Sequence, residues 1–228
     1  MGERGLLGTT KPGRSSAARR AVGVTCVLAV AWGVLTGCGD DGEGGDGGDA
    51  SPSASEGSGS PGGRLTDDQR ERKRMISASK VSYRKALAAA THAVRGTEPV
   101  KAELDSASDS GDRPRWETEV ATARGVASTV LVDAVSGKAQ KPRDAERESD
   151  DRDKLADRLR EAKVTPEQAA RTALDKKGGS VSAVELDDND AGKVIWSVDV
   201  VTPKDWTKTT FDIDAATRKV LREHTDRD

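Results

Sequence analysis

The stretch VIWSVDV at residues 194–200 decides the fold of this 228-residue chain. Apolar and polar residues alternate along it, which places the tryptophan and two valines on one face of a β-strand. The stretch WETEV at residues 116–120 alternates in the same way and also begins with a tryptophan. The two stretches therefore predict antiparallel sheet with one buried face, and they suggest that the chain contains a repeat.

Each of these strands has two predicted neighbours. The six expected strands are residues 100–104, 116–120 and 130–133 in the first half, and 181–186, 194–200 and 209–214 in the second half. A helix rich in small residues precedes each set. The first helix is expected from Ser82 to Val94. The second has Thr165 as its N-cap, Pro166 at the first helical position, and Gln168 three residues after the cap to complete a capping box.

The two halves correspond closely, so the chain is read as a tandem duplication. The matching motifs are Glu103-Leu104-Asp105 with Glu185-Leu186-Asp187, Trp116 with Trp196, and Asp133-Ala134 with Asp214-Ala215. Together they resemble the PepSY domain, which occurs in propeptides of thermolysin-type metalloproteases and in many bacterial envelope proteins. Residues 133–138 fit the closing Asp-Ala-x-x-Gly-Lys turn of that family, whereas Arg218 stands where glycine is usual in the second copy.

The resemblance covers roughly residues 78–140 and 162–224. It implies an α+β fold of two tandem small domains, each with a helix packed on a three-stranded antiparallel sheet. Whether the two copies pack together stays open at this point.

The N-terminus has the pattern of an export signal. Basic residues precede an uncharged stretch at 21–37, which is short for a retained membrane helix. It ends in Leu35-Thr36-Gly37-Cys38, which resembles the bacterial lipobox. The resemblance implies that a signal peptidase recognises Leu35, Thr36 and Gly37 and cuts before a lipidated Cys38. An ordinary signal peptide with a chance cysteine is the alternative, and either the general or the twin-arginine export route is possible.

Residues 39–63 contain six acids, no base, no aromatic residue and no large aliphatic residue. Such a segment cannot bury enough surface to offset its ordering entropy, so a disordered tether is expected. The expected organisation is a lipoprotein signal peptide (1–37), a lipidated cysteine with its tether (38–63), a first PepSY-like domain with a charged lead-in (64–140), a charged helical linker (141–161) and a second PepSY-like domain (162–228).

Composition excludes several classes of protein. The second cysteine, Cys26, lies in the signal stretch, so the processed chain has no internal disulfide. Residues 64–228 carry 32 basic and 32 acidic side chains, which gives no sign of a nucleic-acid partner.

No catalytic residue, metal ligand set or cofactor site is expected, since His92 and His224 are isolated in the sequence. Residues 187–192, DDNDAG, resemble the start of an EF-hand loop. Two ligand positions of that loop are filled by Ala191 and Val198, so a hairpin turn is predicted instead.

Trp206 is the candidate interaction residue. It falls at a strand connection, between charged residues, where the first copy has only Ala123-Arg124-Gly125-Val126. A tryptophan in such a place has the character of an interface anchor. The alternative is that it covers the end of a small core.

These observations predict a non-enzymatic lipoprotein held by Cys38 on the extracytoplasmic face of the cell membrane. The PepSY resemblance implies an envelope or secreted protein as partner, with a protease or cell-wall enzyme, inhibited or localised, as the first candidate. The alternative is an anchored carrier or sensor of a small ligand or metal ion.

Overall fold

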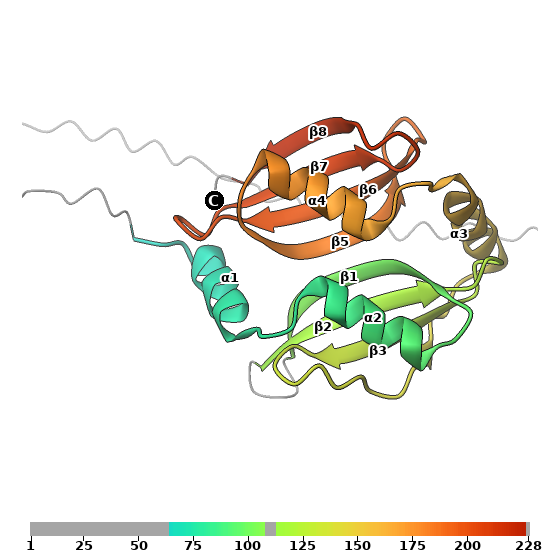
Figure 1. Cartoon of the computed structure of the whole chain (residues 1–228), viewed down its shortest axis with the longest axis horizontal. Coiled ribbons are helices and arrows are strands. Elements are labelled where there is room, and N and C mark those ends of the chain that lie inside the picture. Colours follow the sequence, from blue (N-terminus) through green and yellow to red (C-terminus); the bar gives the residue numbers. More distant parts are fainter. Residues whose placement is uncertain (1–63, 108–112, 227–228) are drawn as a thin grey trace, which may run out of the picture. The chain divides into compact units, whose positions relative to one another are not determined.

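One antiparallel sheet forms the centre of the fold. The computed structural model describes residues 64–107 and 113–226, and eight strands of this part lie in the order β4-β3-β2-β1-β5-β6-β7-β8 (Figure 1). The first copy supplies β1 (Glu98–Ala107), β2 (Arg113–Ala121), β3 (Ala127–Asp133) and β4 (Arg143–Asp144). The second copy supplies β5 (Ser180–Asp188), β6 (Val194–Val201), β7 (Lys208–Asp214) and β8 (Val220–Thr225).

All six predicted strands are confirmed, and so is the α+β class with two tandem helix-on-sheet repeats. The strands β4 and β8 were not predicted, so each copy has four strands rather than three. Both lie at the edges of the sheet. β4 has only two residues, and β8 is mostly exposed, so neither carries the alternation that marks a half-buried strand.

Four helices are present in the described part of the chain: α1 (Asp67–Ala78), α2 (Tyr83–Ala93), α3 (Ser149–Glu161) and α4 (Pro166–Lys176). The predicted helices α2 and α4 are confirmed, as is the capping box between Thr165 and Gln168. The helix α1 was read only as a charged lead-in. Its start is also set by a capping box, formed by Thr66 and Gln69.

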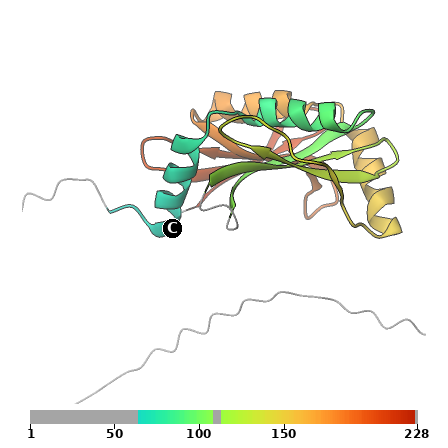
Figure 2. The ribbon, with the colours of Figure 1, turned by 90° about the horizontal axis from the view of Figure 1, so that it is seen from below.

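Helices α2 and α4 cover one face of the sheet, and α1 and α3 lie at its two ends (Figure 2). Small side chains let the two covering helices approach the strands closely. The fully buried alanines are Ala86 and Ala90 in α2, and Ala169, Ala170 and Ala173 in α4. Beneath the helices, the Trp116 indole N–H donates to the Val81 carbonyl at 2.7 Å, and the Trp196 indole N–H donates to the Val164 carbonyl at 2.7 Å.

The two copies join through antiparallel pairing of β1 with β5. Lys101 lies opposite Glu185, and Ala102 lies opposite Val184. Since Ala102 and Val184 are equivalent positions of the repeat, a local twofold axis passes between them. The copies therefore share one sheet and one apolar core. We call the line where β1 meets β5, with the space above it between α2 and α4, the seam.

Candidate protein-binding site

Two cavities lie at opposite ends of the seam, on the face covered by α2 and α4. The α1-side pocket has a volume of about 340 Å³ and is lined by Ile76, Ser79, Lys80, Val81, Ser82, Tyr83, Arg84, Leu104, Trp116, Leu174, Ser180 and Val181. The α3-side pocket has a volume of about 350 Å³ and is lined by Glu98, Pro99, Leu159, Ala162, Lys163, Val164, Thr165, Pro166, Glu167, Leu186 and Trp196. Each pocket thus combines one copy's helix N-terminus with the first residues of the other copy's inner strand.

The local twofold axis relates the two pockets, because equivalent residues of the repeat line both. The shared floor is Val81, Leu104 and Trp116 in one pocket, and Val164, Leu186 and Trp196 in the other. Each tryptophan is held in place by its indole hydrogen bond to the valine carbonyl. That valine is fixed in turn, since the backbone N–H groups of Val81 and Val164 donate to the carbonyls of Ala134 and Ala215. The pockets are therefore built into the fold.

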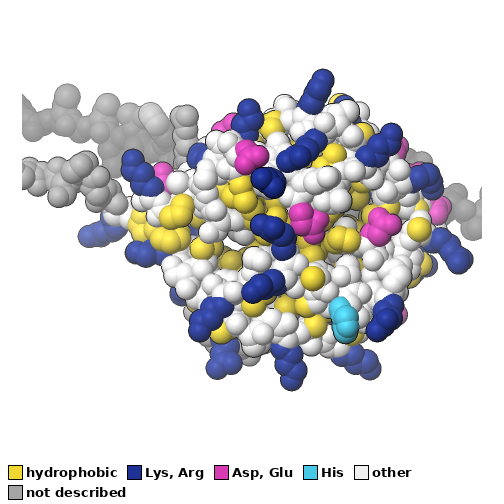
Figure 3. All heavy atoms as spheres, viewed as in Figure 1, with side chains coloured by type: hydrophobic (Ala, Val, Ile, Leu, Met, Phe, Trp, Pro, Cys, Tyr) yellow, Lys and Arg dark blue, Asp and Glu magenta, His cyan; other side chains and the backbone are white. Residues whose placement is uncertain are grey.

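Lys and Arg side chains outnumber Asp and Glu on the face that carries α2 and α4, and apolar surface shows between them (Figure 3). Lys80 and Arg84, at the α1-side pocket, are exposed. The Arg84 guanidinium carbon lies 5.9 Å from the centre of the Tyr83 ring, which is 5% exposed. A cation over an aromatic face is attracted to it, so Arg84 is held close to the pocket rim.

The sequence prediction did not find these pockets. A signal for them was present, because Lys80-Val81-Ser82 before α2 matches Lys163-Val164-Thr165 before α4. These matching triplets supply a floor valine and a rim lysine to each pocket. Their role depends on the seam, which brings the other copy's strand beside them.

The structure places Trp206 in the loop between β6 and β7, where it is half-buried. Its carbonyl accepts a hydrogen bond from Arg72 Nη1 at 3.0 Å, and Lys73 Nζ lies 5.8 Å from the ring centre. Trp206 therefore contacts α1 within the chain. Its backbone has a left-handed φ of 60°, which is rare for a bulky residue.

The equivalent loop of the first copy, between β2 and β3, has Gly125 with φ 74° at the same place. Gly125 packs against the backbone of α3, near Arg152 and Ala156. Each lead-in helix therefore contacts a loop of the other copy: α1 meets the Trp206 loop, and α3 meets the Gly125 loop. These contacts add a second set of links across the two copies.

The lipobox residues Leu35, Thr36 and Gly37, the lipidation site Cys38, and the tether lie outside the described residues. No helix in the described part of the chain has the length and apolar character needed to cross a bilayer.

The sheet face away from α2 and α4 carries charged side chains. Lys101 Nζ lies 2.7 Å from a Glu103 carboxylate oxygen and 3.7 Å from one of Glu117. Desolvation opposes its charge, but these carboxylates outweigh it and raise the pKa of Lys101. Desolvation raises the pKa of Glu185 despite the attraction of Lys101. Lys101, Glu103 and Glu117 are therefore paired with one another within the chain.

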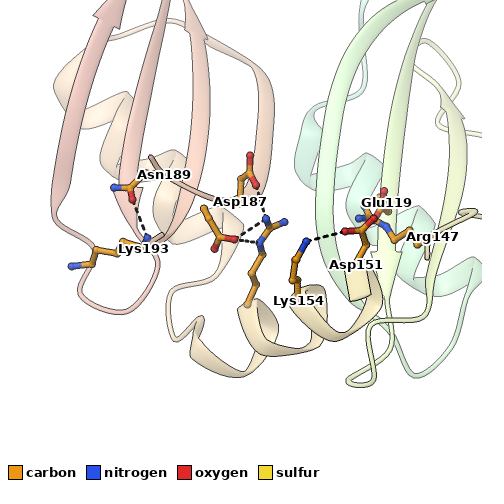
Figure 4. Close-up of polar contacts among 9 residues, drawn as sticks. Glu119, Arg147, Asp151, Lys154, Asp187, Asn189 and Lys193 are labelled. Atoms are coloured by element: carbon orange, nitrogen blue, oxygen red, sulfur yellow. Dashed lines mark hydrogen bonds and ion pairs between the residues drawn. The ribbon is translucent and has the colours of Figure 1, made fainter. Parts of the chain in front are cut away.

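At one end of the sheet, ion pairs attach α3 and the segment before it to the strands (Figure 4). Arg147 donates to a Glu119 carboxylate oxygen at 2.6 Å. Arg158 of α3 reaches Asp187 at 3.0 Å and Asp188 at 2.8 Å. These carboxylates therefore fix the position of α3.

A hairpin turn joins β5 and β6 as predicted, and it is formed by residues 189–193, since Asp187 and Asp188 still belong to β5. The Asn189 side-chain oxygen accepts from the Ala191 N–H at 3.1 Å and from the Lys193 N–H at 2.9 Å, and Gly192 has φ 71° (Figure 4). The asparagine oxygen that an EF-hand would use as a ligand is bonded to the turn backbone here.

The repeated Asp-Ala turns close each copy. The Asp214 carboxylate accepts from the Ala216 and Thr217 N–H groups and lies 2.5 Å from Lys193 Nζ. Burial acts to raise the pKa of Asp214, but these hydrogen bonds outweigh it and hold the pKa well below its ordinary value. Arg218 adopts φ 66°, the conformation that Gly137 supplies with φ 76° in the first copy. This explains why glycine is usual at that position.

The two histidines lie in different copies, His92 on α2 and His224 on β8, and both are exposed. No cluster of three or more His, Cys, Asp or Glu side chains in the described part is placed to hold a metal ion.

The fold and its shared seam define a tandem-repeat α+β protein with paired surface pockets. The chain belongs to the PepSY family, described as the peptidase propeptide and YPEB domain, which matches residues 80–141 and 163–224, more than half of the chain.

Among solved structures, the chain is similar to a "putative lipoprotein" from Clostridium difficile 630, with 18% identity, a TM-score of 0.41, and coverage of 65% of this chain and 95% of that chain. It is also similar to the YpmB protein from Bacillus subtilis, with 17% identity, a TM-score of 0.28, and coverage of 62% and 96%. None of the curated proteins matches the chain.

Proposed function

We propose that this chain is a lipid-anchored protein of the extracytoplasmic face of the cell membrane, and that its PepSY repeats bind an envelope or secreted protein. Membership in a family named after peptidase propeptides supports a protease as the first candidate partner. The repeats act by binding, and they hold the partner inhibited or localised.

The observation that carries the proposal is the pair of pockets at the seam. They are apolar at the floor, ringed by polar groups, and built from both repeats. Such surfaces suit protein recognition, where buried aromatic and aliphatic contacts provide affinity and a polar rim provides specificity.

Partner binding is tested by site-specific photo-crosslinking in intact cells. A crosslinker at the exposed rim position Ser82, whose side chain makes no capping bond, is expected to capture one reproducible envelope or secreted protein. The control places the crosslinker at Glu223, an exposed residue of β8 at the sheet edge. Capture of no protein from Ser82, or of the same proteins from both positions, contradicts the proposal. A captured protease is then assayed with and without the purified chain.

Anchoring is tested separately with Cys38→Ala. The wild-type chain is expected to incorporate labelled fatty acid and to sediment with membranes, whereas Cys38→Ala incorporates none and is released. A Cys38→Ala chain that stays membrane-bound contradicts the lipid anchor but leaves partner binding untouched.

A carrier or sensor of a small ligand is the second candidate, favoured by pocket volumes of about 340 and 350 Å³. Pockets for small ligands have volumes of about 300–1,000 Å³. Thermal shifts on addition of divalent ions or fatty acids would support this function, and the absence of any shift argues against it.

A further inference from the structure

The two seam pockets have the same floor but different rims, and this contrast indicates what the α1-side pocket binds. Lys80 and Lys163 are equivalent and supply one cation to each pocket. Arg84, however, is equivalent to Glu167, and Ser180 is equivalent to Glu98. The net charges of the two pocket rims therefore differ by three units, and two rim positions account for this difference.

As a result, the α1-side pocket carries Lys80 and Arg84, and no Asp or Glu is among the described residues that line it. The α3-side pocket carries Glu98 and Glu167 against the single Lys163. An anionic occupant is attracted to the first pocket and repelled by the second. Opposite charge at a binding surface selects partners in this way.

The floor of the α1-side pocket is apolar. Trp116, which is 2% exposed, and Leu104, which is 7% exposed, are almost covered already, so an occupant mainly meets the aliphatic surface of the partly buried Ile76 and Leu174. The chain's own segment 39–63 is acidic, but it has no large apolar side chain to fill this floor. An occupant that fits combines an apolar side chain with carboxylates, a combination that segment 39–63 does not offer.

The polar groups of the pocket favour a peptide over a lipid. Ser82 and Ser180 are among its lining residues, and the structure gives the Ser82 side chain no bond to the α2 N-terminus. A peptide backbone offers hydrogen-bond partners to such groups, whereas an acyl chain would leave them unpaired at a cost in free energy.

We infer that the α1-side pocket binds an acidic peptide segment of the partner protein, with a large aliphatic side chain against Ile76 and Leu174 and adjacent carboxylates on Lys80 and Arg84. The inference rests on the proposed protein-binding function and specifies the chemistry of the partner. It also assigns the two pockets different roles, since the α3-side pocket does not accept this segment.

The test uses the full-length chain in zwitterionic lipid nanodiscs with isotope-labelled tryptophan. The probes are the blocked peptide acetyl-GDLEG-amide and its neutral analogue acetyl-GNLQG-amide. The NMR signals of the Trp116 and Trp196 indole N–H groups report on the two pockets separately. We expect the acidic peptide to shift the Trp116 signal and leave Trp196 unchanged, with the neutral peptide binding about fivefold more weakly.

Three variants complete the test. Lys80→Glu and Arg84→Glu reverse exposed rim charges and are each expected to weaken binding of the acidic peptide about tenfold. Lys85→Glu is the control, because it makes the same charge change on α2 at an exposed residue that does not line the pocket. An unchanged Trp196 signal shows that each variant is folded.

The inference is overturned if the two peptides bind equally, if Trp196 responds as strongly as Trp116, or if Lys85→Glu weakens binding as much as Lys80→Glu. Absence of any shift at millimolar peptide also overturns it. If palmitate shifts the Trp116 signal and the peptide does not, the pocket binds a lipid and the inference is wrong. If the Trp116 signal disappears because the chain dimerises, the pocket binds a second copy of the chain. If the Lys80→Glu and Arg84→Glu chains still capture the partner in the crosslinking experiment, the proposed protein-binding function remains, but the α1-side pocket is not the place where the partner binds.

Discussion

Gly125→Ala tests the packing of α3 against the first copy. A Cβ atom at Gly125 would overlap the Arg152 carbonyl oxygen and lie 3.1 Å from the Ala156 nitrogen, both in the α3 backbone. Alanine also strains a left-handed backbone, here φ 74°, by about 1–2 kcal/mol. Overpacking against a rigid backbone adds about 1–3 kcal/mol. We therefore expect a total loss of about 2–5 kcal/mol in unfolding free energy.

Gly96→Ala is the matched control. Gly96 has φ 77°, but a Cβ there would meet nothing within 4 Å, so only the backbone strain applies. Thermal unfolding followed by circular dichroism should show a lower Tm for Gly125→Ala, by about 2–4 °C for each additional kcal/mol. Hydrogen exchange should also accelerate in α3. If the two variants lose the same stability, the close approach of α3 at Gly125 is wrong.

Three further outcomes are expected. Asp214→Asn should cost about 2–3 kcal/mol at pH 7 in urea unfolding, more than Asp133→Asn at the less buried equivalent turn. Because folding lowers the pKa of Asp214, the wild-type chain loses this stability as the pH falls below about 4. The difference in unfolding free energy between Asp214→Asn and wild type should therefore shrink at low pH. A difference that stays constant with pH would contradict the lowered pKa of Asp214. Trp116→Phe removes the buried indole donor to the Val81 carbonyl and should lower the unfolding free energy by about 1–3 kcal/mol. Because the two copies share one sheet, calorimetry of this variant should still show a single unfolding transition, and two separate transitions would argue against the shared sheet. Trp206→Gly removes the ring beside Lys73, so amide exchange should accelerate in α1 alone; unchanged exchange would mean that α1 does not depend on this loop.

The strands and the two covering helices could be predicted because their signals are local. Alternation around Trp116 and Trp196 marks half-buried strands, and the Thr165 capping box marks a helix start. The edge strands β4 and β8 lack such signals because few of their side chains are buried. The left-handed backbone at Trp206 was not predictable, since the conformation favours glycine or asparagine.

The seam could not be predicted for a different reason. Strand pairing between β1 and β5 joins residues far apart in the chain, and the pattern on each strand is the same whether its edge is paired or free. Lys101 opposite Glu185 becomes meaningful only when the register is known. The pockets depend on this register, so their residues could be matched in the sequence but not brought together.

The pairing of β1 with β5 also has a consequence for biogenesis. In a chain made from its N-terminus, β5 is complete only about 80 residues after β1. During that interval the inner edge of the first copy exposes unpaired backbone N–H and C=O groups, which are a template for strands of other chains. At high concentration, β1 of one molecule can pair with β5 of another across the same twofold axis, which gives a swapped dimer with native pairing. Timely synthesis of the second copy therefore protects the first from association with other chains.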